Sequence, residues 1–184
     1  MSNKTRSQIM ILCEDKAQLD FIKGYCKEAG WDNRAIISQD LCPAGSQSAE
    51  QWVRERFERT LRTFRGKYGQ GRSVLLLVMI DGDKFSVSER KKQLQQNVQC
   101  TAQEPVLIFV PKRNIQSWMA FLDGDFENEE KDYKQKYQRQ SPNSKYGRNL
   151  RKFCLSSSQE KIPASLEDAC KEWERIDPAY KIGS

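Results

Sequence analysis

The sequence predicts an α/β fold with a mostly parallel central sheet flanked by helices, in the Rossmann-like class. Three continuous apolar runs of strand length, residues 9–13, 74–80 and 105–110, support this prediction, because strands buried on both faces lack the polar alternation of half-exposed strands. Helical patterns separate these runs, and strands that alternate with helices favour parallel pairing through right-handed crossovers. We expect this domain to span residues 7–122, with residues 123–184 packed on it as a basic loop and a C-terminal helix.

Length and composition are typical of one globular domain. The chain has 184 residues, 38% of them hydrophobic and 30% charged, which is enough for a substantial core under a heavily solvated surface. No apolar run approaches the roughly 20 residues that span a bilayer, and the apolar stretch near the N-terminus is too short for a signal peptide. We therefore expect a cytoplasmic protein without a membrane partner, and the oligomeric state stays open.

The net charge and the cysteine and histidine content restrict the partners and the reaction mechanisms that this protein can have. The formal net charge of +6 favours a polyanionic partner such as nucleic acid. Six scattered cysteines without a Cys-x-x-Cys pair argue against both zinc sites and disulfides. The chain has no histidine, which excludes every mechanism that needs an imidazole. Proton transfer would therefore fall to Asp, Glu, Lys or bound water.

The first half of the chain predicts a strand, a helix, a weaker strand and a long helix. Residues 9–13 end at Glu14, and the following apolar positions share one helical face that ends near Gly30. Residues 34–38 form a weaker strand candidate. Ser48 and Gln51 then match a capping box that opens a helix whose outer face is rich in arginine. We interpret that arginine face as a solvated surface.

The central strand, residues 74–80, ends in Asp81-Gly82-Asp83, which we interpret as the active centre. In an extended segment, residues two apart point the same way, so Asp81 and Asp83 are expected to face one ligand together. Carboxylates suit Mg²⁺, which prefers oxygen ligands completed by water and substrate phosphate. The alternative is an ordinary turn, because Asp-Gly is common in turns.

The next part of the chain predicts a helix, a third strand and a second helix. Ser86 and Glu89 form another capping box. The strand at residues 105–110 is broken by Pro111, and a short helix follows around Trp118.

Beyond residue 122 the composition becomes polar and basic. Asp123-Gly124-Asp125 repeats the central tripeptide, but we interpret it as a loop. Basic residues interleaved with tyrosines suit a nucleic-acid backbone with stacked bases, or else a mobile surface loop. A last helix is expected to begin with Ser165 as its cap. The predicted nucleic-acid-binding residues are Arg113, Lys131, Lys134, Lys136, Arg139, Lys145 and Arg148.

Three predicted strands end in charged residues: Glu14, then Asp81 with Asp83, then Lys112. If these strands are parallel and adjacent, the charged groups meet at one sheet edge as a carboxylate cluster with a cation beside it. Such a cluster suits phosphoryl transfer, because carboxylates hold Mg²⁺ and move protons while a cation stabilises developing charge.

These residues resemble the Toprim domain family. The resemblance covers roughly residues 7–122 and lies in the apolar strand ending at Glu14 and the later strand ending in Asp81-Gly82-Asp83, the family's Asp-x-Asp. Residues 110–118 also resemble the segment after the fourth strand in small Toprim-like proteins related to the overcoming-lysogenization-defect nucleases.

The resemblance implies a nuclease that cleaves phosphodiester bonds in DNA or RNA with Mg²⁺ or Mn²⁺, within a phage-defence or repair complex. By it, Glu14 is the general acid/base and a metal ligand, Asp81 and Asp83 are metal ligands, and Lys112 is an electrostatic catalyst. Members often have Gly where this chain has Asp15, and the small relatives commonly have an acid at Gln116. Loss of that acid would remove a second metal site.

Two other functions fit parts of the pattern. A receiver domain also places an acidic pair after its first strand, an Asp after its third and a Lys after its last. A catalytically weak or inactive Toprim-like shell would instead bind nucleic acid or serve as the partner of an ATPase. The chain has no Walker A loop, so any such ATPase would be a separate protein.

Overall fold

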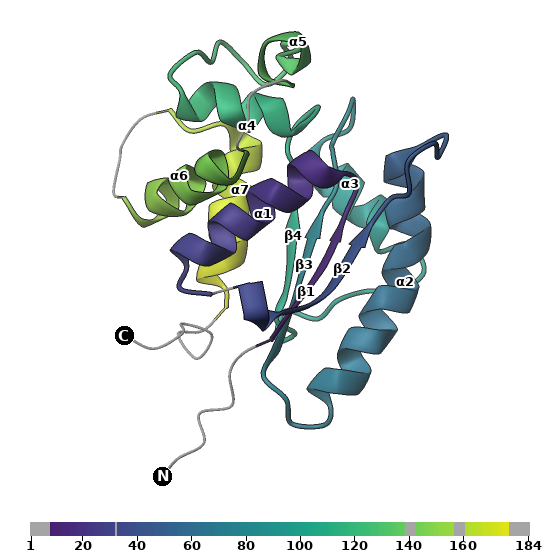
Figure 1. Ribbon diagram of the computed structural model, residues 1–184. Coiled ribbons are helices and arrows are strands. Elements are labelled where there is room, and N and C mark those ends of the chain that lie inside the picture. The colour runs from purple at the N-terminus through teal and green to yellow at the C-terminus, as the bar shows by residue number, and fades with distance from the viewer. Residues whose placement is uncertain (1–7, 32, 139–142, 157–160, 177–184) are drawn as a thin grey trace.

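The computed structural model describes residues 8–31, 33–138, 143–156 and 161–176. Its centre is a four-stranded, wholly parallel sheet in the order β2-β1-β3-β4. This architecture confirms the predicted α/β class with a parallel sheet flanked by helices (Figure 1). The strands are β1 (Gln8–Cys13), β2 (Ile36–Leu41), β3 (Val74–Met79) and β4 (Val106–Phe109). The helices are α1 (Lys16–Glu28), the 3₁₀ turn η1 (Asn33–Ala35), α2 (Ala49–Tyr68), α3 (Val87–Leu94), α4 (Ile115–Leu122), α5 (Lys134–Tyr137), α6 (Asn143–Leu155) and α7 (Ala164–Glu174).

Helices cover both faces of the sheet, as Figure 1 shows: α1, α4, α6 and α7 on one side, α2 and α3 on the other. Alternate strand residues therefore enter two separate cores. Ile9 and Ile11 of β1 pack with α1 and α7, whereas Met10 and Leu12 pack with α2 and α3. Every residue of β3 is buried, which explains why its sequence is continuously apolar.

The order of the strands creates a topological switch point between β1 and β3. The chain leaves β1 in one direction to reach β2, and then crosses back over β1 to β3 and on to β4. The helices of the first two crossovers, α1 and α2, lie on opposite faces. In open α/β sheets the crevice at such a switch point, beyond the carboxyl ends of the strands, is where ligands bind.

Side chains of α7 and of Arg175, the residue that follows it, cover the outer edge of β4. Glu172 accepts a hydrogen bond from the Ile108 N–H at 3.4 Å, and Arg175 donates to the Val106 carbonyl at 2.5 Å. These side chains satisfy backbone groups that a further strand would otherwise take, which protects the sheet edge.

The basic segment after residue 130 is not the loop that the sequence suggested. Most of its described residues form α5 and α6, and α6 packs closely against α1. A Cβ added at Gly147 would lie 1.9 Å from the Phe21 carbonyl oxygen, and one added at Gly24 would lie 2.0 Å from that of Ser144. Glycine at both positions is therefore what allows the two helix backbones to approach.

Two local predictions are wrong. Ser165 does not cap the last helix, because the N-cap of α7 is Pro163, two residues earlier. The Ser165 hydroxyl instead accepts a hydrogen bond from the Trp118 indole at 2.8 Å. Cys154 and Cys170 form a disulfide between α6 and α7, contrary to the expectation of none. Their pairing follows from the packing of two helices, which residue spacing does not reveal.

Among the described residues, no helix is both long enough and apolar enough to cross a membrane.

Candidate functional site

Glu14 and Asp81 meet at the switch point, at the carboxyl ends of the adjacent strands β1 and β3. The Asp81 N–H donates to Glu14 Oε1 at 2.5 Å. Gln18 of α1 connects both residues: its Nε2 donates to Asp81 Oδ1 at 2.8 Å, and its Oε1 accepts the Glu14 N–H at 3.0 Å. Gln18 is almost completely buried, so packing fixes the amide that holds the two acids together.

The environment of this acid pair favours protonation. Burial raises the pKa of Glu14 from its ordinary value of 4.5 to about 7, against the lowering effect of the Asp81 N–H, and the charges of Asp83 and Asp15 raise it further. Burial, and then the charge of Glu14, raise the pKa of Asp81 well above its ordinary value. Two acids this close repel each other when both are charged, and a bound cation relieves that repulsion.

Asp15 has a different role from its neighbour Glu14. Its side chain is the N-cap of α1, where Oδ1 accepts the Gln18 N–H at 2.8 Å. An N-cap carboxylate satisfies one of the unpaired amides at the start of a helix. Asp15 therefore positions Gln18, and through it the acid pair.

Asp83 does not point the same way as Asp81, contrary to the prediction. Asp81 bonds to Gln18 of α1, whereas Asp83 Oδ2 pairs with Arg90 of α3 at 2.8 Å, on the other face of the sheet. The prediction assumed an extended backbone, but β3 ends at Met79 and Asp83 has a φ of 50°. Burial raises the pKa of Asp83, the charge of Arg90 lowers it, and the charge of Glu50 raises it again.

Arg90 is a buried cation that the sequence analysis missed. Its side chain is 1% exposed, and it pairs with Asp83 and with Glu50 of α2 at 2.7 Å while its guanidinium lies over the Phe85 ring. Loss of either acid would leave part of the buried charge of this arginine uncompensated, which strongly destabilises a fold. The available signal was its position between Val87 and Leu94 on the apolar stripe of α3, where a charged residue requires partners.

The loops after β3 and β4 are joined by backbone hydrogen bonds. The Gly82 N–H donates to Pro111 O at 2.8 Å, and the Asp83 N–H donates to Arg113 O at 3.1 Å. A Cβ on Gly82 would lie 3.1 Å from Pro111 O, so glycine permits this approach. Asp83 and Arg113 both have positive φ, and strained backbone of this kind clusters at functional sites.

Lys112 lies beside this loop pair but does not contact the acids directly. Its Nζ donates to the Phe85 carbonyl at 3.2 Å and pairs with Glu130 at 3.3 Å. Arg113 also turns to this segment, donating to the Glu130 carbonyl at 2.8 Å. The structure therefore brings together Glu14, Asp81 and Gln18, with Asp83 and Lys112 on neighbouring loops.

The basic segment does not offer aromatic faces to a nucleic acid. Its three tyrosines, Tyr133, Tyr137 and Tyr146, are all buried, so the expectation of base stacking on them is wrong. They fill the space between the C-terminal helices and the domain, as an interleaved apolar pattern on helices requires. The cations remain at the surface, where Lys131 pairs with Glu127 and Lys136 with Asp125. Lys134 and Lys145 are exposed and Arg148 is half-buried, and Arg139 lies outside the described residues.

The acid pair offers a divalent cation two carboxylate ligands. Mg²⁺ in proteins commonly takes one or two carboxylates and completes its shell with water and substrate phosphate, and Glu14 with Asp81 supply such a pair. Within the described residues, no group of three or more Asp, Glu, Cys or His residues is placed to hold a metal ion. Gln116 is buried in α4 and provides no carboxylate.

Comparison of the chain with protein-family models, with curated proteins and with solved structures gave no match.

Proposed function

We propose that this protein is a Toprim-like nuclease that hydrolyses phosphodiester bonds in DNA or RNA with Mg²⁺ or Mn²⁺. The observation that carries the proposal is the direct contact of Glu14 and Asp81 at the switch point. Two half-buried carboxylates whose pKa values are raised destabilise the fold, so their presence at the switch point, beyond the carboxyl ends of the strands, supports a functional role.

Glu14 is the proposed general acid/base. In hydrolysis, a water oxygen forms a bond to phosphorus, the bond from phosphorus to the leaving oxygen breaks, and the water proton passes to a base. Since the pKa of Glu14 is raised to about 7, its carboxylate accepts that proton and its acid form returns it to a leaving oxygen near neutral pH.

Glu14 and Asp81 would hold the cation, and Asp83 would join them only by leaving Arg90. A bound Mg²⁺ or Mn²⁺ supplies charge neutralisation of the phosphate oxygens and a more acidic bound water. Lys112, on the loop after β4, is the proposed electrostatic partner of the phosphate.

The first test is metal binding and cleavage by Asp81→Ala and by the Asp81→Ala/Asp83→Ala double variant. We expect calorimetry with Mn²⁺ to show binding to the wild-type protein that the double variant lacks, and Asp81→Ala to lose cleavage of DNA and RNA. Asp20→Ala is the matched control, because Asp20 lies on α1 in an exposed pair with Lys16. Mg²⁺-dependent cleavage retained by Asp81→Ala would overturn the proposal.

A second candidate is an inactive nucleic-acid-binding or ATPase-partner subunit with the same fold. It is favoured by the ion pair that holds Asp83 on Arg90 and by the lack of a three-acid group among the described residues. Nucleic-acid binding without metal binding or cleavage in the wild-type protein would support it.

The receiver-type alternative shares the strand order observed here. It needs both acids after β1 in the site, however, and Asp15 is used as the cap of α1. We therefore favour hydrolysis over phosphoryl acceptance by Asp81.

A further inference from the structure

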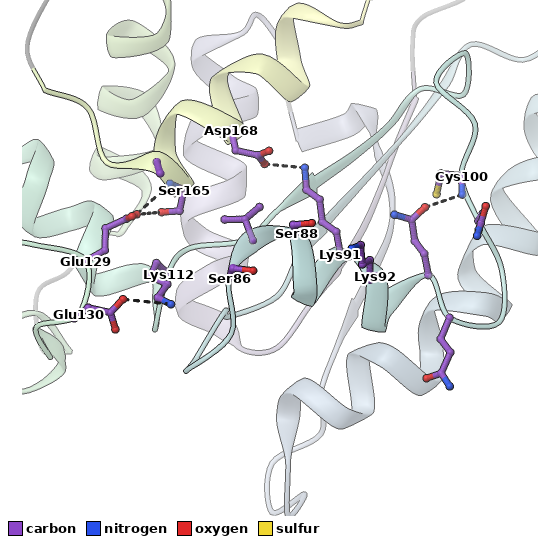
Figure 2. A pocket seen from close by; sticks show the side chains of 15 residues that line it. Ser86, Ser88, Lys91, Lys92, Cys100, Lys112, Glu129, Glu130, Ser165 and Asp168 are labelled. Atoms are coloured by element: carbon purple, nitrogen blue, oxygen red, sulfur yellow. Dashed lines mark hydrogen bonds and ion pairs between the residues drawn. The ribbon is translucent and has the colours of Figure 1, made fainter.

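A large groove lies beside the candidate site, between α3 and the start of α7. Its volume is about 860 Å³, and Figure 2 shows the side chains that line it. One end is formed by Ser86 and Lys112, and Lys112 Nζ bonds to Phe85 O in the loop that carries Asp83. The groove therefore ends beside the loop that carries Asp83.

The lining of the groove suits phosphates and not bases. It contains three lysines, three acids that pair with some of its donors, serine hydroxyls and the amides of three glutamines, and no aromatic side chain. Bases of single-stranded nucleic acids are held by stacking on aromatic rings, whereas their backbone is held by cations and hydrogen-bond donors.

The three lysines differ in how firmly they are held. Lys91 is 17% exposed and pairs with Asp168 at 2.7 Å and with Glu172 at 2.6 Å, so it is fixed in the structure. Lys92 lines the groove from the exposed side of α3. Lys112 is 15% exposed, but its partner Glu130 is 72% exposed, and an exposed acid separates from its partner at little cost.

Two adjacent acids occupy the places in the groove where an anion would bind. Figure 2 shows Glu129 against Ser165 and Glu130 against Lys112. Glu129 accepts hydrogen bonds from both the backbone N–H, at 3.1 Å, and the hydroxyl of Ser165 in the first turn of α7. Carboxylates at these positions are held by the same groups that bind phosphate oxygens.

We propose that this groove binds the phosphodiester backbone of a single-stranded nucleic acid. In the free protein Glu130 pairs with Lys112, and a phosphate of the bound strand takes the place of Glu130. The proposal rests on the proposed nuclease function for the direction of the strand toward Glu14 and Asp81. It assigns Lys92 and Lys112 as phosphate contacts and Glu130 as an internal competitor.

The test measures binding of a fluorescent oligothymidylate by anisotropy, in EDTA and at low salt, so that no cleavage is needed. We expect Lys92→Ala to weaken binding by about three- to tenfold and Glu130→Gln to tighten it by about two- to fivefold, as removal of an exposed competing ion pair allows. Glu174→Gln and Lys67→Ala are the matched controls, since both residues lie outside the groove. An oligouridylate compares RNA with DNA.

The outcomes separate the groove from the nuclease activity. Groove-dependent binding without cleavage in Mg²⁺ would overturn the proposed function and leave the groove assignment intact. Glu130→Gln and Glu174→Gln tightening binding equally would overturn the groove, because net charge alone would then explain the gain. Competition by inorganic phosphate at the concentration of oligonucleotide phosphate would overturn the strand assignment and indicate a site for a single phosphate.

Discussion

The acid site and the basic segment look alike in sequence, as clusters of charge, but they are built differently. Glu14 and Asp81 are 67 residues apart and meet through a backbone hydrogen bond and a buried glutamine. The basic residues of the C-terminal segment are near neighbours in sequence, and most of the described ones lie at the surface, whereas Arg151 and the tyrosines are buried. Long-range convergence that costs stability is thus a stronger indication of function than local clustering of charge.

The largest expected effect tests whether the basic segment is a structural part of the domain. Gly147→Ala should lower the free energy of unfolding by about 3 kcal/mol or more, because its Cβ meets the Phe21 carbonyl and must push α6 from α1. Gly66→Ala is the control: it is also helical, has nothing within 4 Å of an added Cβ, and should raise stability by up to about 1 kcal/mol. Denaturant unfolding measures both, and equal effects would contradict the close packing of α6.

A smaller loss is expected from removing the cation that holds Asp83. Arg90→Met leaves Glu50 and Asp83 without their shared partner. It should lower the free energy of unfolding by about 2 to 4 kcal/mol, somewhat less than for a fully buried pair because Asp83 is half-exposed. Arg62→Met, which breaks an exposed pair with Glu58 on α2, should change stability by no more than about 0.5 kcal/mol. Similar losses of stability in the two variants would show that Arg90 does not hold Glu50 and Asp83 as a buried ion pair.

Removing the charge of Glu14 from the acid site should increase the stability of the protein. Burial raises the pKa of Glu14 in the native protein from 4.5 to about 7. Between these pH values the native state therefore binds more protons than the unfolded state, and stability falls as pH rises. Glu14→Gln keeps an acceptor for the Asp81 N–H and should be more stable than the wild type by about 1 to 3 kcal/mol above pH 7, without metal.

The difference between Glu14→Gln and the wild type should vanish below pH 4.5, where Glu14 is protonated in both states. Urea unfolding in EDTA at several pH values measures it, with Glu174→Gln on the surface of α7 as the control. A difference that does not depend on pH would show that Glu14 is not buried as described.

The sequence predicted those features that depend on strand burial and strand direction. Continuous apolar runs located β1, β3 and β4, and parallel pairing then placed Glu14 and Asp81 at one edge. The orientation of Asp83 was not predictable, because it depends on a positive φ and on hydrogen bonds to the loop after β4.

The helices α5 and α6 were missed for a different reason, whereas the last helix, α7, was predicted. The polar composition of the segment masked α6, which buries only Tyr146, Gly147, Leu150 and Arg151 and whose partner α1 lies far away in sequence. The Cys154–Cys170 disulfide and the Glu130–Lys112 pair likewise join segments that are separate in sequence. Contacts between elements that are far apart in sequence leave no local pattern, so they can be identified only from the structure.

The smallest expected effect is on the exposed lysines of α5. Changing Lys134 and Lys136 together to Ala should alter the free energy of unfolding by less than about 0.5 kcal/mol, because both side chains are exposed and the Lys136–Asp125 pair is at the surface. If both residues contact phosphates, the dependence of log K on log salt for a single strand should become shallower by about 1.4. Anisotropy titrations over a range of salt measure this slope. An unchanged slope would show that these two lysines face water and contact no phosphate. The strand would then be held by the groove between α3 and α7.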